Sequence, residues 1–263
     1  MLVVVASFSR FVTAQMLPSR TTPDLLAWMW VLLSEQLGAV PKRLLWDNET
    51  GIGRRGRLAE GVAGFCGTLA TRLVQCKPFD PESKGIVERA NGFMETSFLP
   101  GRTFLSPADF NAQLTGWLPL ANQRSVRSLR ARPVDLVEAD LTAMLALPPV
   151  PPASGHRTRI RLGRDYFVRI AGSDYSVDPI VIGRMVEATA GLETVTITAD
   201  GRLVGHHARS WTSAATVIDP THVESAARLR AAFQQPSSTE DPLRRDLADY
   251  DRAFGVSLDG QVA

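Results

Sequence analysis

The chain has 263 residues, of which 44% are hydrophobic and 21% are charged. This balance is typical of a folded globular protein and excludes a disordered one. The 29 basic and 27 acidic residues leave a net charge of +2, which excludes a polybasic tail protein but permits local basic patches. Cys66 and Cys76 lack CxxC spacing and lie far from the four histidines, which argues against a zinc finger or a disulfide scaffold.

The first 17 residues are apolar, but no charged segment precedes them and no small-residue cleavage pattern follows. Arg10 interrupts the run, so we expect neither a signal peptide nor a membrane span, and a cytoplasmic protein. The pattern predicts two strands, Leu2–Phe8 and Phe11–Leu17, joined by a turn at Ser9–Arg10.

Thr22-Pro23-Asp24 is a typical helix start, and Gly38 marks the end of the helical periodicity that follows. The run from Lys42 to Trp46 predicts a short buried strand that leads directly into Asp47. The remaining elements of this half are a Gly/Arg-rich loop at 51–57, a helix at 58–70, a strand at 71–76 and helices at 83–98, 106–118 and 134–145.

A proline-rich stretch at 147–155 predicts a stiff linker, after which short strands recur as in a small barrel of about 55 residues. We therefore expect four segments: an α/β core at 1–146, the linker at 147–155, a β-barrel at 156–212, and an acidic, partly helical and loosely packed tail at 213–263.

Two strands, a helix and a strand that ends in Asp47 are the order expected in a mixed α/β sheet, where a carboxylate at the strand end is well placed for a metal. On the predicted helix at 83–98, Lys84, Glu88 and Asn91 share one face. These side chains can hold a divalent cation and touch phosphate oxygens. Spacing alone favours the alternative, a solvated face with a Lys–Glu pair.

Three runs of sequence carry a family resemblance: Leu44-Leu-Trp-Asp-Asn-Glu-Thr-Gly51, the run from Cys76 to Asn91 with its Lys-Gly-Ile-Val-Glu-Arg motif, and Ala121-Asn-Gln-Arg-Ser-Val-Arg127. Together they resemble the integrase-type DDE recombinases, in particular the IstA-type transposases of bacterial insertion sequences. The resemblance covers roughly residues 1–212. The strands after the linker resemble the β-barrel that follows the catalytic core in this family, including Mu transposase.

The resemblance implies an RNase H-like core in which three carboxylates hold two Mg²⁺ or Mn²⁺ ions for phosphodiester cleavage and strand transfer during DNA integration. By motif, Asp47 is the second carboxylate and Glu88 the third, with 40 residues between them. Three other acids, ranked well below these two, are Glu49, Glu82 and Glu95.

The resemblance also implies contacts with double-stranded DNA, both transposon ends and target. Lys84, Arg89 and Asn91 are expected to touch the DNA end near the metals. A second set recurs every third residue and could clamp the phosphate backbone, or could form a solvated helix face: Arg124, Arg127 and Arg130. The barrel arginines at 157, 159, 161 and 164 fit either DNA contact or a charged edge strand. A homo-oligomer and an ATPase helper protein are the other implied partners, and no membrane is.

One departure from the family pattern affects the expected activity. The family places its first catalytic Asp on a strand upstream of the hairpin, and no residue before Asp24 is acidic. We therefore expect a core that lacks its first strand, weak metal binding, and little or no strand transfer by this chain alone. The alternatives are a non-catalytic DNA-binding or oligomerising remnant and, more weakly, an RNase H-fold nuclease with a different third ligand.

Overall fold

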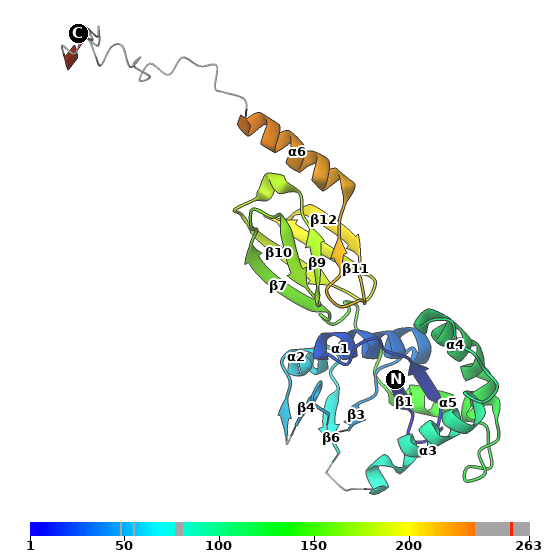
Figure 1. Cartoon of the computed structure of the whole chain (residues 1–263). Coiled ribbons are helices and arrows are strands. Elements are labelled where there is room, and N and C mark those ends of the chain that lie inside the picture. Colours follow the sequence, from blue (N-terminus) through cyan, green and yellow to red (C-terminus); the bar gives the residue numbers. More distant parts are fainter. Residues whose placement is uncertain (48, 55, 77–80, 235–252, 255–263) are drawn as a thin grey trace.

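The computed structural model describes residues 1–47, 49–54, 56–76, 81–234 and 253–254, with only the backbone for 81–84. The N-terminal unit and a small barrel follow one another along the molecule, and the last long helix lies at the far side of the barrel (Figure 1). None of the described helices is long and apolar enough to cross a membrane.

The N-terminal unit alternates short strands with helices. Its elements in chain order are β1 (Leu2–Val5), β2 (Val12–Gln15), α1 (Thr22–Val31), the π-helix η1 (Leu32–Leu37), β3 (Arg43–Trp46), β4 (Gly53–Arg54), β5 (Arg57–Leu58), α2 (Val62–Thr68), β6 (Arg72–Gln75), α3 (Pro81–Ser97), α4 (Pro107–Gln123) and α5 (Pro133–Ala143).

The predicted hairpin and first helix are confirmed. Strands β1 and β2 pair antiparallel from Leu2 opposite Gln15 to Val5 opposite Val12, with the reversal at Arg10 in the left-handed region. The first helix runs through η1 and ends at Gly38, whose φ of +78° suits glycine and few other residues.

Two local predictions were wrong. The Gly/Arg-rich loop contains a small antiparallel hairpin, β4–β5, and the helix expected at 58–70 covers only Val62–Thr68. Its start is delayed because Gly61 adopts a φ of +84°, which is outside the helical region. The helix expected at 106–118 extends to Gln123, with Pro119 inside it.

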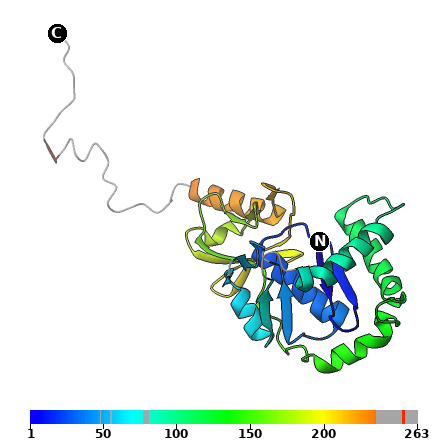
Figure 2. The same ribbon diagram turned by 90° about the horizontal axis from the view of Figure 1, so that it is seen from below.

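Strands β3 and β6 pair in parallel, from Arg43 opposite Arg72 to Trp46 opposite Gln75, in a sheet separate from the β1–β2 hairpin. Both strands therefore end at the same edge, which places Asp47 and Cys76 side by side along that edge. Seen from below, helices α3, α4 and α5 form an arc around one side of the unit (Figure 2).

Side-chain amides cover the outer edge of β2. Asn122 accepts a hydrogen bond from the Val12 backbone N–H through Oδ1 and donates one from Nδ2 to the Val12 carbonyl, both at 2.9 Å. Asn111 bonds the N–H and carbonyl of Met16 in the same way, at 2.8 and 3.1 Å. These amides replace a neighbouring strand, so the backbone groups of an edge strand stay paired where they are buried.

Asn122→Ala leaves two buried backbone groups of Val12 without partners, because Asn122 is only 3% exposed. We expect the free energy of unfolding in urea to fall by about 1–3 kcal/mol. The adjacent, exposed Gln123→Ala is the matched control and should leave the midpoint unchanged. Equal midpoints for both variants would show that the Asn122 amide does not support the β2 edge.

The second unit is the expected small barrel. A four-stranded sheet has the order β12-β11-β10-β7, and a three-stranded sheet has the order β13-β9-β8. The elements are β7 (His156–Arg161), β8 (Phe167–Ile170), β9 (Ser173–Ser176), the 3-10 helix η2 (Pro179–Val181), β10 (Met185–Ala190), β11 (Thr194–Ala199), β12 (Arg202–Ala208), β13 (Thr216–Val217) and α6 (Pro220–Gln234).

One apolar cluster, which includes Val168, Tyr175, Val186 and Ile197, lies between the two sheets of the barrel. The predicted α/β class is confirmed, but the single mixed sheet expected for the core is not found among the described residues, where β1–β2, β3–β6 and β4–β5 are separate two-stranded sheets. Helix α6 confirms the prediction that the first part of the acidic tail is helical. Residues 235–252 and 255–263 of that tail lie outside the described residues.

Candidate functional site

The two carboxylates assigned by motif lie at solvent-exposed positions. Asp47 directly follows β3 at the strand edge where β6 also ends, and Glu88 lies in the second turn of α3. Only residues 77–80 separate Cys76 from the start of α3. Helix α3 contacts β1 of the N-terminal hairpin, and whether Glu88 shares a site with Asp47 stays a prediction.

Carboxylate oxygens are the donors that Mg²⁺ prefers, so Asp47 and Glu88 are of the right chemical type. Within the described part of the chain, however, no group of three or more His, Cys, Asp or Glu side chains is arranged to hold a metal ion. Asp47 and Glu88 therefore stay predicted ligands that have the right chemistry for such an ion.

Glu49 is one of the three acids ranked below Asp47 and Glu88, and both of its carboxylate oxygens have a bonding partner. Its Oε1 accepts a hydrogen bond from Trp46 Nε1 at 2.7 Å, and its Oε2 pairs with Arg20. This side chain fixes the loop after β3. Glu95 is exposed farther along α3, and the side chain of Glu82 lies outside the described residues.

The residues expected to contact a DNA end lie on α3. Lys84 belongs to the helix, but its side chain lies outside the described residues. Arg89 is exposed and folds back over Gly85, where an added Cβ would lie 3.5 Å from Arg89 Nη1. The Oδ1 atom of Asn91 is buried and has no hydrogen-bond partner in the described part of the chain.

The three arginines at 124, 127 and 130 do not share a helix face, because α4 ends at Gln123. The Arg124 guanidinium stacks on the Phe93 ring at 3.5 Å, and burial lowers the pKa of Arg124. Arg127 and Arg130 are exposed in a tight turn, which backbone pairing between residues 126 and 131 closes. The helix-face interpretation was wrong, and the turn presents two arginines to solvent.

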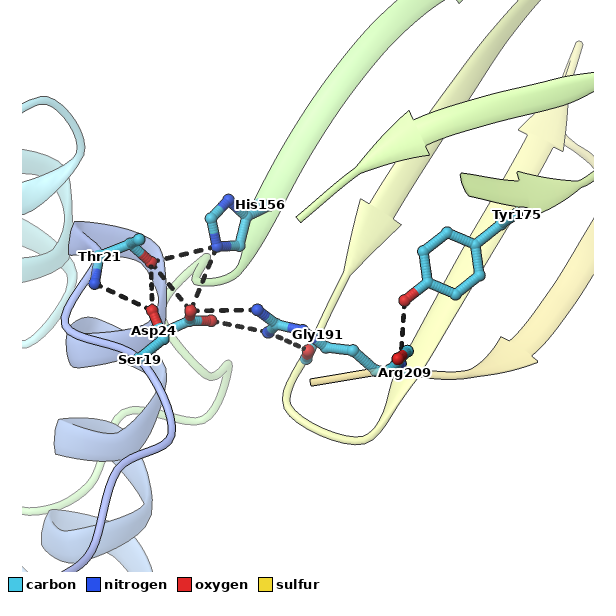
Figure 3. Close-up of polar contacts among 8 residues, drawn as sticks. Ser19, Thr21, Asp24, His156, Tyr175, Gly191 and Arg209 are labelled. Carbon is cyan, nitrogen blue, oxygen red and sulfur yellow. Dashed lines mark hydrogen bonds and ion pairs between the residues drawn. The ribbon is translucent and has the colours of Figure 1, made fainter. Parts of the chain in front are cut away.

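A buried ion pair that the sequence did not reveal joins the two units (Figure 3). Asp24, 1% exposed, accepts two hydrogen bonds from Arg209, with Nη1–Oδ1 at 2.7 Å and Nη2–Oδ2 at 3.0 Å. Oδ2 also accepts a bond from Thr21 Oγ1 at 2.9 Å, and His156 Nε2 lies 3.3 Å away from it. Asp24 and Thr21 belong to the start of α1, whereas Arg209 and His156 belong to the barrel.

The barrel itself orients Arg209. Its Nη1 also donates to the Gly191 carbonyl at 2.7 Å, and its guanidinium stacks on the Trp211 ring at 3.7 Å. The next residue, Ser210, donates its backbone N–H to Tyr175 Oη at 2.9 Å (Figure 3). The guanidinium is held in place by these contacts, and a fixed arginine loses little side-chain freedom when it pairs with Asp24.

The charge state of Asp24 follows from these contacts. Burial by itself would raise the pKa of this carboxyl, but the hydrogen bonds from His156 and Arg209 outweigh burial and hold the pKa well below its ordinary value. Asp24 is therefore ionised at neutral pH and pairs with a charged arginine.

Asp24→Asn leaves Arg209 buried without its counter-charge, and we expect a loss of about 3–5 kcal/mol in the free energy of unfolding at pH 7. Because the folded-state pKa of Asp24 lies below its unfolded value, the stabilisation is present above about pH 4 and disappears as the pH falls further. Urea unfolding from pH 7 to pH 3 should therefore show the gap between wild type and variant closing on the acid side.

Asp135→Asn is the control, because it removes an exposed carboxylate that pairs with Arg132 three residues away. It should leave the unfolding midpoint unchanged. If the Asp24→Asn protein is as stable as wild type at pH 7, the Asp24–Arg209 ion pair does not stabilise the contact between the two units.

The chain is similar in sequence to several known proteins. Residues 147–219 match the model of the Mu transposase C-terminal domain. The chain is 29% identical over 196 residues to the transposase-designated protein Rv3428c of Mycobacterium tuberculosis, a match that spans 71% of this chain and 48% of that protein. It is 26% identical over 190 residues to y4uI of Sinorhizobium fredii, likewise designated a transposase, over 68% of this chain and 37% of that protein.

Two solved structures show limited similarity. The catalytic core domain of BIV integrase aligns with a TM-score of 0.41 and 21% identity, over 53% of this chain and 86% of that one. A simian T-cell lymphotropic virus intasome, solved with the PP2A regulatory subunit B56 gamma, gives a TM-score of 0.41 and 19% identity, over 83% of this chain and 72% of that one.

Residues 147–219 are thus similar to the Mu transposase C-terminal domain, and most of the chain is similar in sequence to two proteins designated transposases. These matches do not single out the IstA type. The chain spans less than half the length of the two curated relatives.

Proposed function

We propose that this chain is part of a transposase that binds DNA and acts in integrase-type DNA recombination. One observation carries the proposal: a Mu transposase C-terminal domain follows, in the same chain, an α/β unit with a carboxylate at the end of a strand. The sequence relationship to two proteins designated transposases extends through both units.

Asp47 and Glu88 are, in this proposal, the second and third carboxylates of a site for Mg²⁺ or Mn²⁺. Such ions, when bound, activate an attacking oxygen and stabilise the leaving oxygen of a phosphodiester. The chain's own contribution would be to hold one carboxylate directly after β3 and the other on α3. Since the described residues hold no three-ligand group, we expect weak binding and little or no strand transfer by this chain alone.

Exposed arginines would supply the DNA contacts. Arg127 and Arg130 project from their turn, and Lys84, Arg89 and Asn91 lie on α3 beside Glu88. Strand β7 is an edge strand of the barrel and carries three exposed arginines, of which Arg159 lies 3.5 Å from Glu187 and Arg161 donates to the Gly183 carbonyl. Arginines spread over both units could follow the phosphate backbone of a duplex.

The wider partners follow from the same proposal. A transposase that joins paired DNA ends works as a homo-oligomer, and an ATPase helper protein is the further partner that the family resemblance implies. The alternative function is a non-catalytic chain that binds DNA or oligomerises. The absence of a three-ligand group among the described residues favours that alternative.

Manganese binding tests the carboxylate pair without requiring catalysis. We expect the full chain to bind Mn²⁺, and Asp47→Asn or Glu88→Gln to weaken the affinity at least about tenfold, because each removes a charged ligand. Glu95→Gln, an exposed acid two turns farther along α3, is the control and should bind as wild type does. Isothermal titration and Mn²⁺ electron paramagnetic resonance provide the readouts.

Indistinguishable Mn²⁺ affinities for all four proteins would remove Asp47 and Glu88 from the proposed site. DNA binding that persists under that result would support the non-catalytic alternative.

Salt dependence tests the arginine turn. Arg127→Ala should weaken DNA binding about equally across sequences and reduce the slope of log K against log salt by about one, because one phosphate contact and its released counterion are lost. Arg132→Ala removes an arginine that already pairs with Asp135, at 2.7 Å, and should change the slope less. An unchanged slope for Arg127→Ala would place phosphate binding elsewhere.

A further inference from the structure

The apolar side of α6 continues beyond the barrel that it packs against. Four residues lie on this side at helical spacing, and their exposure rises along the helix from 7% at His222 and 5% at Ala226 to 42% at Leu229 and 93% at Phe233. The first half of the stripe is therefore buried on the barrel. The second half presents a large aromatic side chain to solvent.

A groove of about 410 Å³ lies beside this exposed half, between α6 and the segment around η2. Its apolar lining includes Tyr166, Ile182, Leu229 and Phe233. Arg164 and Arg230 also line it, and both are exposed. A groove with an apolar floor and two arginines suits an amphipathic helix that carries acidic residues.

The chain contains a segment with that chemistry. Asp241-Pro242 is a typical helix start, and an apolar stripe follows with the same spacing as the stripe of α6: Leu243, Leu247, Tyr250 and Phe254. Between residues 240 and 252 there are five acidic and three basic residues, so the segment is net negative. Its charge is opposite to that of the arginines in the groove.

The rings of Phe233 and Phe254 are both open to solvent among the described residues, at 93% and 76% exposure. A reciprocal exchange between two copies would bury both rings twice in a symmetric pair, because each copy carries the groove and the segment that fits it.

We propose that residues 241–254 of one copy bind, as an amphipathic helix, in the groove between η2 and α6 of a second copy, and that the second copy does the same in return. Phe254 is the apolar anchor in the groove, next to Phe233 of the other copy. Arg164 and Arg230 pair with the acidic side of the incoming helix. The link from Gln234 to Asp241 is short, so the exchange holds the two barrels close together.

Sedimentation equilibrium of the full chain tests this exchange. Wild type should be a dimer at micromolar concentration, and Phe233→Ala or Phe254→Ala should each raise the dimer dissociation constant at least about tenfold. Both phenylalanines are exposed, so these variants should keep the wild-type circular dichroism and melting temperature. Two controls should dimerise normally: Leu105→Ala, which is 93% exposed in the N-terminal unit, and Arg245→Ala on the opposite side of the segment.

A mixture of the two variants separates exchange between copies from any other arrangement. A mixed dimer of Phe233→Ala with Phe254→Ala contains one intact groove filled by one intact segment, whereas each variant alone contains two damaged contacts. The equimolar mixture should therefore associate more tightly than either variant. Three results would each overturn the proposal. They are a dimer affinity of the mixture equal to the average of the two variants, a wild-type chain that stays monomeric at all concentrations, and variants that dimerise like wild type.

Discussion

The buried ion pair between Asp24 and Arg209 is the contact on which the arrangement of the two units depends. It joins the first turn of α1 to the end of the barrel across 185 residues of sequence, and both side chains are almost fully buried. A buried charge pair of this kind gives little net stability compared with apolar packing, but it is costly to break and tolerates few geometries. The junction therefore fixes where the barrel lies relative to the N-terminal unit.

Under the proposed function, that fixed arrangement would matter for binding a stiff DNA duplex. Arginines on the two units would act together on DNA only if the units hold a constant relative position, and a loose linker would lose this advantage. The proline-rich segment before β7 limits the reach of the chain, and His156 at the start of β7 adds a further contact to Asp24. The short proline-rich segment and the Asp24–Arg209 ion pair together orient β7 and its arginines.

Much of the fold could be predicted from the sequence because local signals agree with the tertiary structure. The Thr22-Pro23 start and Gly38 stop mark the first helix, and β-type patterning marks the strands of the barrel. The predictions failed where backbone geometry overrides composition. Gly61 delays α2, and the regularly spaced arginines after Gln123 lie in a turn and not on a helix.

Two features could not be predicted, because both depend on pairs of residues distant in sequence. They are the Asp24–Arg209 ion pair between the units and the side-chain amides that bond the edge of β2. Asp24 is a common type of residue in a first helical turn, and nothing nearby indicates that its partner is Arg209. Asn122 could be singled out by motif, yet its structural role is to bond the backbone of Val12. The carboxylates at 47 and 88 were assigned by motif alone; Asp47 follows β3 and Glu88 lies on α3, and their shared site stays a prediction.

The proposed function requires that the Asp47 and Glu88 carboxylates bind one cation at the end of β3. Anomalous diffraction from crystals of the full chain soaked in Mn²⁺ measures this directly. We expect a manganese peak in coordinating contact with both carboxylates. Manganese bound by other side chains only, with these two carboxylates on opposite faces of the unit, would contradict it.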